Sequence, residues 1–303
     1  MGRKFRQKRR QDMGYSALAD LIYHIWKTRN HALWNGAVKH PHKIVREIQL
    51  DVWIILALLF LVVFISDVHA KRPNFQPSPW KPARATFYGN PDGSGTFGGA
   101  CGYGDAVSKE GPGYGTQTAA LSTPMFKNGA ACGSCYELKC EDTSKGCKPR
   151  APIISITATN LCPEGGWCSS PQEHFDLSQP AYLQFAVYKA GVVPIQYRRV
   201  PCIRKGGIRF TISSKSNPYF LLLLVWNVGG AGDVESVMIK GDTGKPFTPM
   251  KRNWGQYWES HESLVGQAIT VRLKTSDGKQ STSWRDIPKN WQFGQTYEGK
   301  NLS

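Results

Sequence analysis

The sequence predicts an all-β protein built from two successive domains, a β-barrel followed by a β-sandwich. From residue 85 on, short apolar runs alternate with polar residues and are broken by glycine-rich turns, a pattern typical of strands. All eight cysteines lie in residues 101–202, and none follows in the remaining hundred residues. The chain has 303 residues, 31 glycines and 10 tryptophans, enough length for two domains and many tight turns.

The first 70 residues are expected to precede the folded domains. Residues 1–50 form an atypical basic extension with 11 Lys/Arg against 3 Asp/Glu, and residues 52–65 (VWIILALLFLVVFI) are uncharged and apolar. A run of 14 residues is short for a membrane span but suits a signal peptide, which we predict at 51–70 with cleavage after Ala70. The 50 residues before it leave three explanations: a misassigned start, an unusually long leader, or a retained membrane anchor. We favour the first two.

The barrel is predicted over residues 85–205, after a proline-rich leader at 71–84. Four prolines in the leader favour an extended conformation. Strands are predicted at 85–88, 119–126, 136–140, 153–159 and 195–200, with one helix at 180–188. Many short strands with turn signals between them indicate a β-barrel.

The cysteines indicate disulfides and therefore an oxidising, extracellular compartment. The competing interpretation is zinc, because Cys132 and Cys135 form a CxxC pair. A zinc ribbon would need a second close pair or nearby histidines, and Cys140 does not complete such a pattern. We expect no metal and no cofactor.

The second domain, residues 206–303, is predicted to be a cysteine-free β-sandwich. Its strands are expected at 208–212, 219–228, 234–240 and 268–275. The unbroken apolar run from Leu221 to Val225 predicts a central strand. Residues 204–207 (RKGG) are interpreted as a hinge between the domains.

Asp176, in the stretch HFDLS at 174–178, is the carboxylate that we predict to be functional. Apolar Phe175 and Leu177 flank it at strand-like alternation, so the acid is expected to point away from the core into a cleft. Partial desolvation there would raise its pKa and let it act as a proton donor near neutral pH. The alternative interpretation is that Asp176 caps a helix that begins near Ser178.

Taken together, these stretches resemble the plant expansins, most closely the alpha type, from Ala85 to Gly299. The motifs that carry the resemblance are TFYG at 86–89, GGACGYG at 98–104, CGSC at 132–135, TATN at 157–160, HFDLS at 174–178, RRVPC at 198–202, GGAGDV at 229–234, NWGQ at 253–256 and FGQT at 293–296. Each is common alone, but their order and spacing are specific.

The resemblance implies a six-stranded double-psi barrel, an immunoglobulin-like β-sandwich and a secreted protein that loosens cell walls without cutting them. It also implies four disulfides: Cys101–Cys132, Cys135–Cys202, Cys140–Cys147 and, as the additional alpha-type pair, Cys162–Cys168.

The barrel is similar to that of inverting endoglucanases, in which an acid in a His-Phe-Asp motif protonates the leaving oxygen. Inversion also needs a carboxylate base roughly 6.5–9.5 Å away. Where those enzymes carry Thr-x-Tyr-x-Asp, this chain has Asn90, whose amide cannot accept a proton near neutral pH. Asp92 and Asp105 are the only plausible substitutes, so a weak endoglucanase is the alternative to a non-hydrolytic protein.

The remaining candidates are ligand-contacting side chains. In the barrel, Thr86, Tyr88, His174 and Asn160 are expected to line a glucan groove around Asp176, with core packing the competing role for Tyr88 and a structural hydrogen bond the competing role for His174. Changing Asp176 to Asn is expected to abolish loosening. In the sandwich, Tyr219, Trp254 and Trp258 are predicted to stack on cellulose.

Three further tryptophans receive structural roles: Trp226 is expected in the core, and Trp284 and Trp291 are assigned to packing. Lys245-Pro246-Phe247 stands where alpha-expansins usually carry Trp, which puts one aromatic contact in doubt.

The charge indicates anionic surroundings. Residues 71–303 hold 27 Lys/Arg against 17 Asp/Glu, a net charge of +10, which would keep a secreted domain near an acidic polysaccharide. No nucleic-acid motif is present, and an oxidised extracellular domain argues against such a partner. The expected partners are therefore cellulose, xyloglucan and acidic wall polysaccharides, bound by a monomer.

Overall fold

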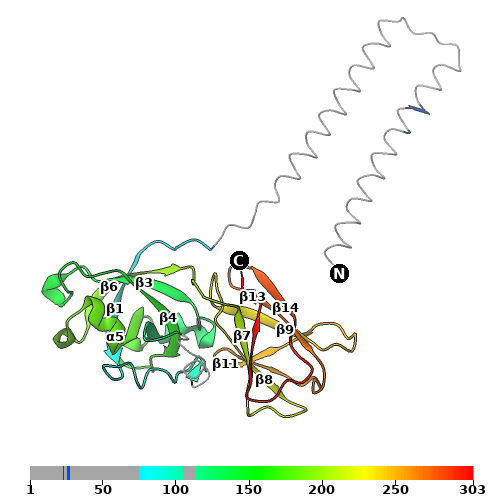
Figure 1. Cartoon of the computed structure of the whole chain (residues 1–303). Coiled ribbons are helices and arrows are strands. Elements are labelled where there is room, and N and C mark those ends of the chain that lie inside the picture. The colour runs from blue at the N-terminus through cyan, green and yellow to red at the C-terminus, as the bar shows by residue number, and fades with distance from the viewer. Residues whose placement is uncertain (1–22, 24–25, 28–74, 105–113, 303) are drawn as a thin grey trace, which may run out of the picture. The chain divides into compact units, whose positions relative to one another are not determined.

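The computed structural model describes residues 23, 26–27, 75–104 and 114–302 (Figure 1). The predicted signal peptide at 51–70, its membrane-anchor alternative and most of the basic extension lie outside these ranges. No helix in the described ranges is long and apolar enough to cross a membrane. The chain divides into two compact units at Arg72, and the second unit, Pro73–Ser303, contains both predicted β-domains.

Six strands close into the predicted barrel in the order β1-β5-β2-β4-β3-β6. β1 runs parallel to β5 and β2 runs parallel to β4, while the other neighbours are antiparallel. The strands are β1 Lys81–Tyr88, β2 Thr118–Leu121, β3 Cys135–Lys139, β4 Ile154–Leu161, β5 His174–Ser178 and β6 Val193–Val200. Helix α4 spans Thr123–Phe126, α5 spans Gln179–Phe185, and short 3-10 turns lie at Lys127–Gly129, Thr143–Lys145, Gly166–Cys168 and Tyr188–Ala190.

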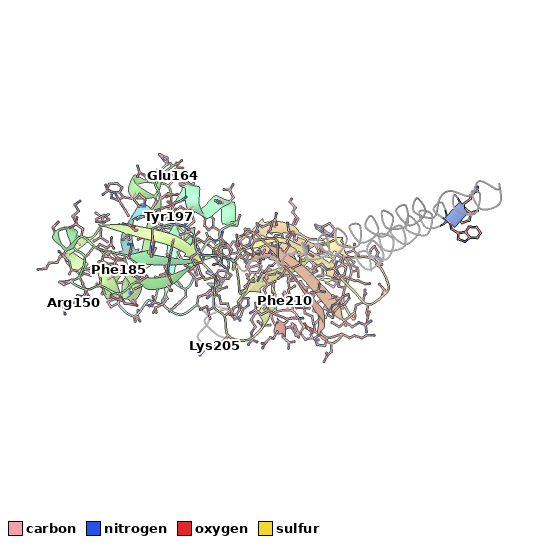
Figure 2. The ribbon with its side chains drawn as sticks, turned by 90° about the horizontal axis from the view of Figure 1, so that it is seen from above. Arg150, Glu164, Phe185, Tyr197, Lys205 and Phe210 are labelled. Carbon is pink, nitrogen blue, oxygen red and sulfur yellow. A yellow bond between two sulfur atoms is a disulfide. The ribbon has the colours of Figure 1, made fainter. Side chains whose placement is uncertain are left out.

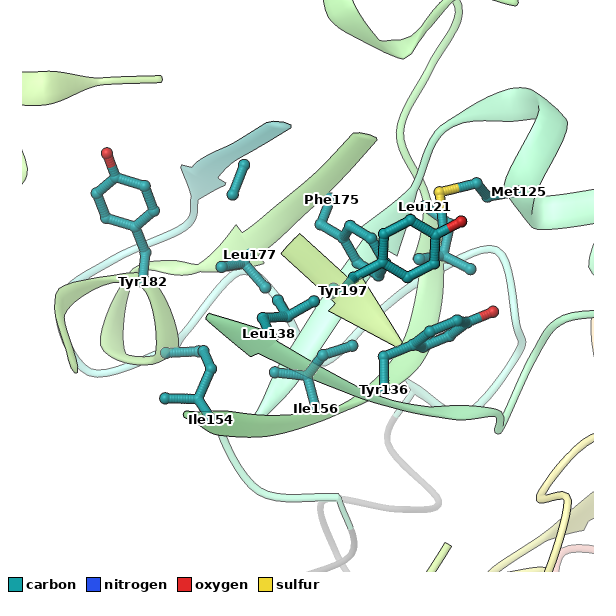
Figure 3. Close-up of a cluster of buried hydrophobic side chains, with 14 of the residues drawn as sticks. Leu121, Met125, Tyr136, Leu138, Ile154, Ile156, Phe175, Leu177, Tyr182 and Tyr197 are labelled. Atoms are coloured by element: carbon teal, nitrogen blue, oxygen red, sulfur yellow. The ribbon is translucent and has the colours of Figure 1, made fainter. Parts of the chain in front are cut away.

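The barrel interior is filled by alternating apolar side chains (Figure 3). On β5, Phe175 and Leu177 are fully buried in this core, and the rings of Phe175 and Tyr136 meet edge to face. Because side chains alternate across a strand, Asp176 is on the opposite, outward face. The alternation predicted for this stretch is therefore confirmed.

Two predicted boundaries were wrong. β1 begins at Lys81, so the barrel does not start at residue 85, and the last four residues of the leader are strand; Pro82 is tolerated near the strand start. The run 119–126 is not one strand. β2 ends at Leu121, and Pro124, in the first turn of α4, starts a helical turn because its fixed φ suits that position.

Four disulfides staple the barrel domain, with the pairing that the resemblance implied. Their Cα–Cα distances are 5.3–5.7 Å, ordinary for this bond. They join Cys101–Cys132, Cys135–Cys202, Cys140–Cys147 and Cys162–Cys168, and no cysteine is free.

The second domain is a two-sheet β-sandwich. One sheet has the order β10-β9-β13-β14 and the other the order β11-β12-β8-β7-β15. The strands are β7 Ile208–Ile212, β8 Leu221–Trp226, β9 Val234–Lys240, β10 Thr248–Pro249, β11 Lys251–Trp254, β12 Tyr257–Ser260, β13 Ile269–Thr275, β14 Gln280–Ile287 and β15 Thr296–Gly299. Figure 2 labels Phe210 of this domain, and Phe185 and Tyr197 of the barrel.

Strand β8 explains the unbroken apolar run. Leu223 and Val225 lie in the sandwich core, whereas Leu224 and Trp226 belong to the apolar cluster of the barrel. All six β8 residues are buried, because each face of the strand meets a different core. The central position predicted for this strand is confirmed.

The segment interpreted as a hinge is held by hydrogen bonds. Asn227 Nδ2 donates to the carbonyls of Lys205 and Gly207 at 2.8 Å each, and Asn301 Nδ2 donates to Gly206 O. Arg204 reaches back to Gly133 O and Thr157 Oγ1 of the barrel. The connection between the domains is thus an ordered segment held by hydrogen bonds rather than a flexible linker.

Candidate functional site: a buried acid and an aromatic surface

The site is built on the outward faces of β1 and β5. The two strands run parallel with Thr86 opposite Asp176 and Tyr88 opposite Ser178. Ser178 is the N-cap of α5, where its Oγ accepts a hydrogen bond from Ala181 N at 3.3 Å. Asp176 is therefore not the helix cap; it lies on the outward face of β5, partly accessible to solvent.

A hydrogen-bonded chain connects His174, Thr86 and Asp176. Thr86 Oγ1 lies 2.7 Å from Asp176 Oδ1 and 2.8 Å from His174 Nε2. With Asp176 ionised, the Thr86 hydroxyl donates to the carboxylate and accepts from the imidazole N–H. With Asp176 protonated, both hydrogen bonds can reverse. Asp176 Oδ2 lies 3.9 Å from Cys162 Sγ, a disulfide sulfur with no proton to donate.

Burial sets the electrostatics of this chain. Loss of solvent raises the pKa of Asp176, and the hydrogen bond from Thr86 partly opposes that rise. Burial, followed by the positive charge of Arg84, lowers the pKa of His174 to about 4. His174 thus stays neutral in mildly acidic solution, while the raised pKa of Asp176 makes that carboxyl easier to protonate than an exposed aspartate.

Tyr88 and Asn160 lie along the same outward face. Asn160 Nδ2 donates to Tyr88 Oη at 3.3 Å, and Asn160 Oδ1 accepts from Ala100 N at 2.7 Å. This amide therefore ties the glycine-rich segment 98–104 to the end of β4. Gly99 is required there, because a Cβ would lie 2.6 Å from Thr159 O.

The stretch that holds Asn90 and Asp92 forms a turn after β1, in which Asn90 N donates to Ser94 O at 3.0 Å. Asn90 is exposed and closes a turn, donating from Nδ2 to Ser94 Oγ at 2.8 Å. Asp92 accepts from Ser94 N in the same turn, and this hydrogen bond lowers the pKa of Asp92, which makes it a weak base. Asp105 lies outside the described residues.

The predicted aromatic surface of the sandwich needs one correction. Trp254 and Tyr219 are 45% and 78% exposed, as a sugar-stacking role requires. Trp258 is only 3% exposed and lies in the sandwich core with the Arg252 guanidinium over its ring, so the prediction that it binds cellulose was wrong.

Tyr257 is the neighbour of Trp258 on β12, and sequence reasoning missed its contact with Trp254. Its half-buried ring packs against the apolar cluster of the barrel, and its centroid lies 5.0 Å from that of Trp254. Side-chain alternation along β12 was the signal that Tyr257 and Trp258 lie on opposite faces.

Of the three tryptophans assigned to packing, two are buried and one is exposed. Trp226 and Trp291 are buried, at 4% and 7% exposure, in agreement with their structural assignment. Trp284 is 63% exposed on β14, so its assignment to packing was wrong. Its edge contacts Phe247, the residue near the expected tryptophan position, whose ring also covers the Arg272 guanidinium.

Curated relatives establish the family. The chain is 53% identical over 265 residues to Expansin-A32 of Oryza sativa subsp. japonica, an alignment that covers 82% of this chain and 97% of the relative. The chain belongs to the alpha-expansin family. Expansin-A23 of Arabidopsis thaliana is 50% identical over 235 residues, covering 75% of this alpha-expansin chain and 82% of the relative.

Family models and solved structures agree with this assignment. Residues 208–288 match the expansin C-terminal domain, and residues 118–197 match a model described as lytic transglycolase. The fold resembles apo Clavibacter michiganensis expansin, with a TM-score of 0.56 at 20% identity over 74% of this alpha-expansin and 97% of that chain. A mutant of the bacterial protein in complex with cellohexaose gives a TM-score of 0.55 at 19% identity, covering 73% and 96% of the two chains.

The described ranges of this alpha-expansin contain no metal-binding cluster. No group of three or more His, Cys, Asp or Glu residues there is arranged to hold an ion.

Proposed function

We propose that this chain loosens plant cell walls without hydrolysis by disrupting hydrogen bonds between cellulose and matrix glucans. The observation that carries the proposal is the environment of Asp176. It is a largely buried acid with a raised pKa, hydrogen-bonded to Thr86, in a site where Asn90 replaces the base. A proton donor without a water-activating partner can rearrange hydrogen bonds but lacks half of an inverting hydrolase.

The protonated form of Asp176 is the active one in this proposal. At acidic pH the carboxyl donates a hydrogen bond to a glucan hydroxyl that would otherwise pair with a neighbouring chain. His174 is neutral under the same conditions, so it adds no positive charge that would favour the ionised form of Asp176. Tyr88 and Asn160 orient the glucan along the same face, and each chain can then slip past its neighbour.

Glucan binding by the sandwich raises the local concentration of glucan near Asp176. Trp254 and Tyr219 offer exposed ring faces on which sugar rings of cellulose or xyloglucan can stack. The bacterial relative in complex with cellohexaose supports a β-glucan as the ligand class. The basic balance of residues 71–303 would add attraction to acidic wall polysaccharides around a secreted, monomeric protein.

The test pairs wild type with Asp176→Asn and Asp176→Glu. A heat-inactivated wall held under constant load is expected to extend with wild type, to stop extending with Asp176→Asn and to recover in part with Asp176→Glu. Unchanged extension with Asp176→Asn would contradict the proposal. Binding to cellulose should persist in all three, because the aromatic surface of the sandwich is untouched.

A further inference from the structure

An exposed tryptophan lies beside the acid, on a segment to which no role has been given. Trp167 is 40% exposed in the short 3-10 turn Gly166–Cys168, between β4 and β5. Exposure alone does not mark a binding residue, since Trp284 is more exposed, but an accessible indole offers a flat apolar face on which a sugar ring can stack.

The turn that carries Trp167 is fixed to the site at both ends. The Cys162–Cys168 disulfide closes it, and Cys162 N donates to Leu121 O at 2.8 Å. Both cysteines are buried against Ala120, and Tyr88 packs on the same cluster. The Cys162 sulfur also contacts the carboxyl of Asp176, so the ring is tied to the groove through one covalent loop.

Arg84 holds the indole in place. Its guanidinium carbon lies 4.0 Å from the Trp167 ring centroid, within cation–π distance. Since Arg84 covers one face of the ring, the exposed area is on the other face and the edges. Arg84 also lines a recess of about 610 Å³ with Glu173 and Pro171, so the barrel surface beside it is hollowed.

The register of β1 and β5 gives the distance along the strands between Arg84, which contacts Trp167, and Asp176. Arg84 pairs with His174 and Thr86 pairs with Asp176, so the two positions are two residues apart along adjacent strands, roughly 6.6 Å. This offset is of the order of one hexose ring. A chain that lies over Asp176 would therefore bring its next sugar over or beside Trp167.

We propose that Trp167 is a sugar-stacking residue of the barrel, binding the ring of a neutral β-linked glucan next to the one that contacts Asp176. This inference rests on the proposed function, because it takes the glucan groove as its starting point. Arg84 acts as a positioning residue that fixes the indole from behind. The barrel then binds the glucan independently of the sandwich, whose exposed aromatic residues bind the glucan at a second place.

The test follows individual indole N–H signals by nuclear magnetic resonance in the secreted protein during titration with cellohexaose. Trp167→Phe, Trp254→Phe and Trp284→Phe assign the three signals by their loss. Trp284, at 63% exposure on β14, is the control for an exposed tryptophan outside the groove. We expect the Trp167 signal to shift with saturation and the Trp284 signal to stay fixed.

A second measurement separates binding from folding. Trp167→Ala should weaken cellohexaose binding to the barrel, measured in a Trp254→Ala background, by about tenfold, the loss expected for one stacking contact. Trp167→Phe should retain part of the affinity, and thermal unfolding of both should match the background protein. A purely structural cation–π role would lower stability without this affinity difference.

The outcomes distinguish the two claims. A shifting Trp254 signal with a motionless Trp167 signal would overturn the inference and leave the proposed function standing. Neither signal shifting would contradict glucan binding itself, and the inference with it. A shift at Trp167 together with weaker binding by Trp167→Ala supports both.

Discussion

At the scale of single residues, Thr86 is expected to influence the pH at which Asp176 takes up a proton. Its hydroxyl joins Asp176 and His174, and its hydrogen bond lowers the pKa of Asp176 against the rise caused by burial. Thr86→Val removes that hydrogen bond, so the pKa of Asp176 should rise further. The pH at which wall extension is half-maximal should therefore move upward.

The control for this prediction is Thr86→Ser, which keeps the hydroxyl. Its pH profile of wall extension should overlay that of wild type. A Thr86→Val profile that falls at the same pH as wild type, or at a lower one, would mean that the hydroxyl does not govern protonation of Asp176.

Asp176 should also reduce the stability of the fold at neutral pH. A carboxyl whose pKa is raised by folding binds its proton more tightly in the folded state, so its contribution is favourable at low pH and is lost as pH rises through the folded-state pKa. Asp176→Asn removes the titration. The variant should unfold at a higher temperature than wild type at neutral pH, with the difference shrinking on acidification.

Calorimetry across this pH range checks the sign. A variant that is less stable than wild type at neutral pH would show that the ionised carboxylate is favoured by the fold. Such a result would remove the basis for a proton-donating Asp176.

At the scale of elements, the neighbouring strands β11 and β12 carry two tryptophans with different roles, one expected to bind sugar and one packed in the core. Trp258 is buried in the sandwich, while Trp254, at the end of β11, is exposed. Trp258→Ala should lower the free energy of unfolding by about 3–5 kcal/mol, the usual cost of emptying an aromatic core position. Trp254→Ala should change that free energy by about 1 kcal/mol or less.

Cellulose pull-down and denaturant unfolding together test this assignment. Trp254→Ala should lose binding with its fold intact. Retained binding in Trp254→Ala would move the sugar-stacking role to Tyr219.

Sequence patterns predicted those parts of the molecule that depend on local alternation. The outward direction of Asp176 followed from Phe175 and Leu177, and the central place of β8 followed from its apolar run. Trp258 was misassigned because loop-like composition around it concealed a short strand with one inward position. The resemblance supplied the disulfide pairs and the grouping of Thr86 and His174 around Asp176, but contacts outside its motifs escaped prediction: Arg84 meets Trp167 only because β1 and the disulfide loop, distant in sequence, meet beside β5.

At the scale of the molecule, barrel and sandwich share an apolar cluster, and an ion pair joins them. Leu224 and Trp226 of the sandwich pack with the barrel core, and Arg199 Nη2 on β6 lies 2.6 Å from Asp233 Oδ1. Arg199 Nη2 also donates to Ala231 O at 2.9 Å. These contacts indicate that the two domains unfold together.

Asp233→Ala tests this coupling. It leaves the partly buried Arg199 without its carboxylate and should lower the free energy of unfolding by about 2 kcal/mol. Lys274→Ala, which breaks the more exposed pair with Glu235, is the matched control and should cost about 0.5 kcal/mol or less. An Asp233→Ala protein as stable as wild type would show that the ion pair does not couple the domains.

The central claim is that a buried acid without a base moves glucan chains instead of cutting them. The most direct measurement records extension of a loaded, heat-inactivated wall at acidic pH while reducing ends released from the same wall are assayed. Extension without new reducing ends, lost in Asp176→Asn, is the predicted result. New reducing ends that disappear in Asp176→Asn would contradict it, and a substitute base would then have to be sought at Asp92 or Asp105.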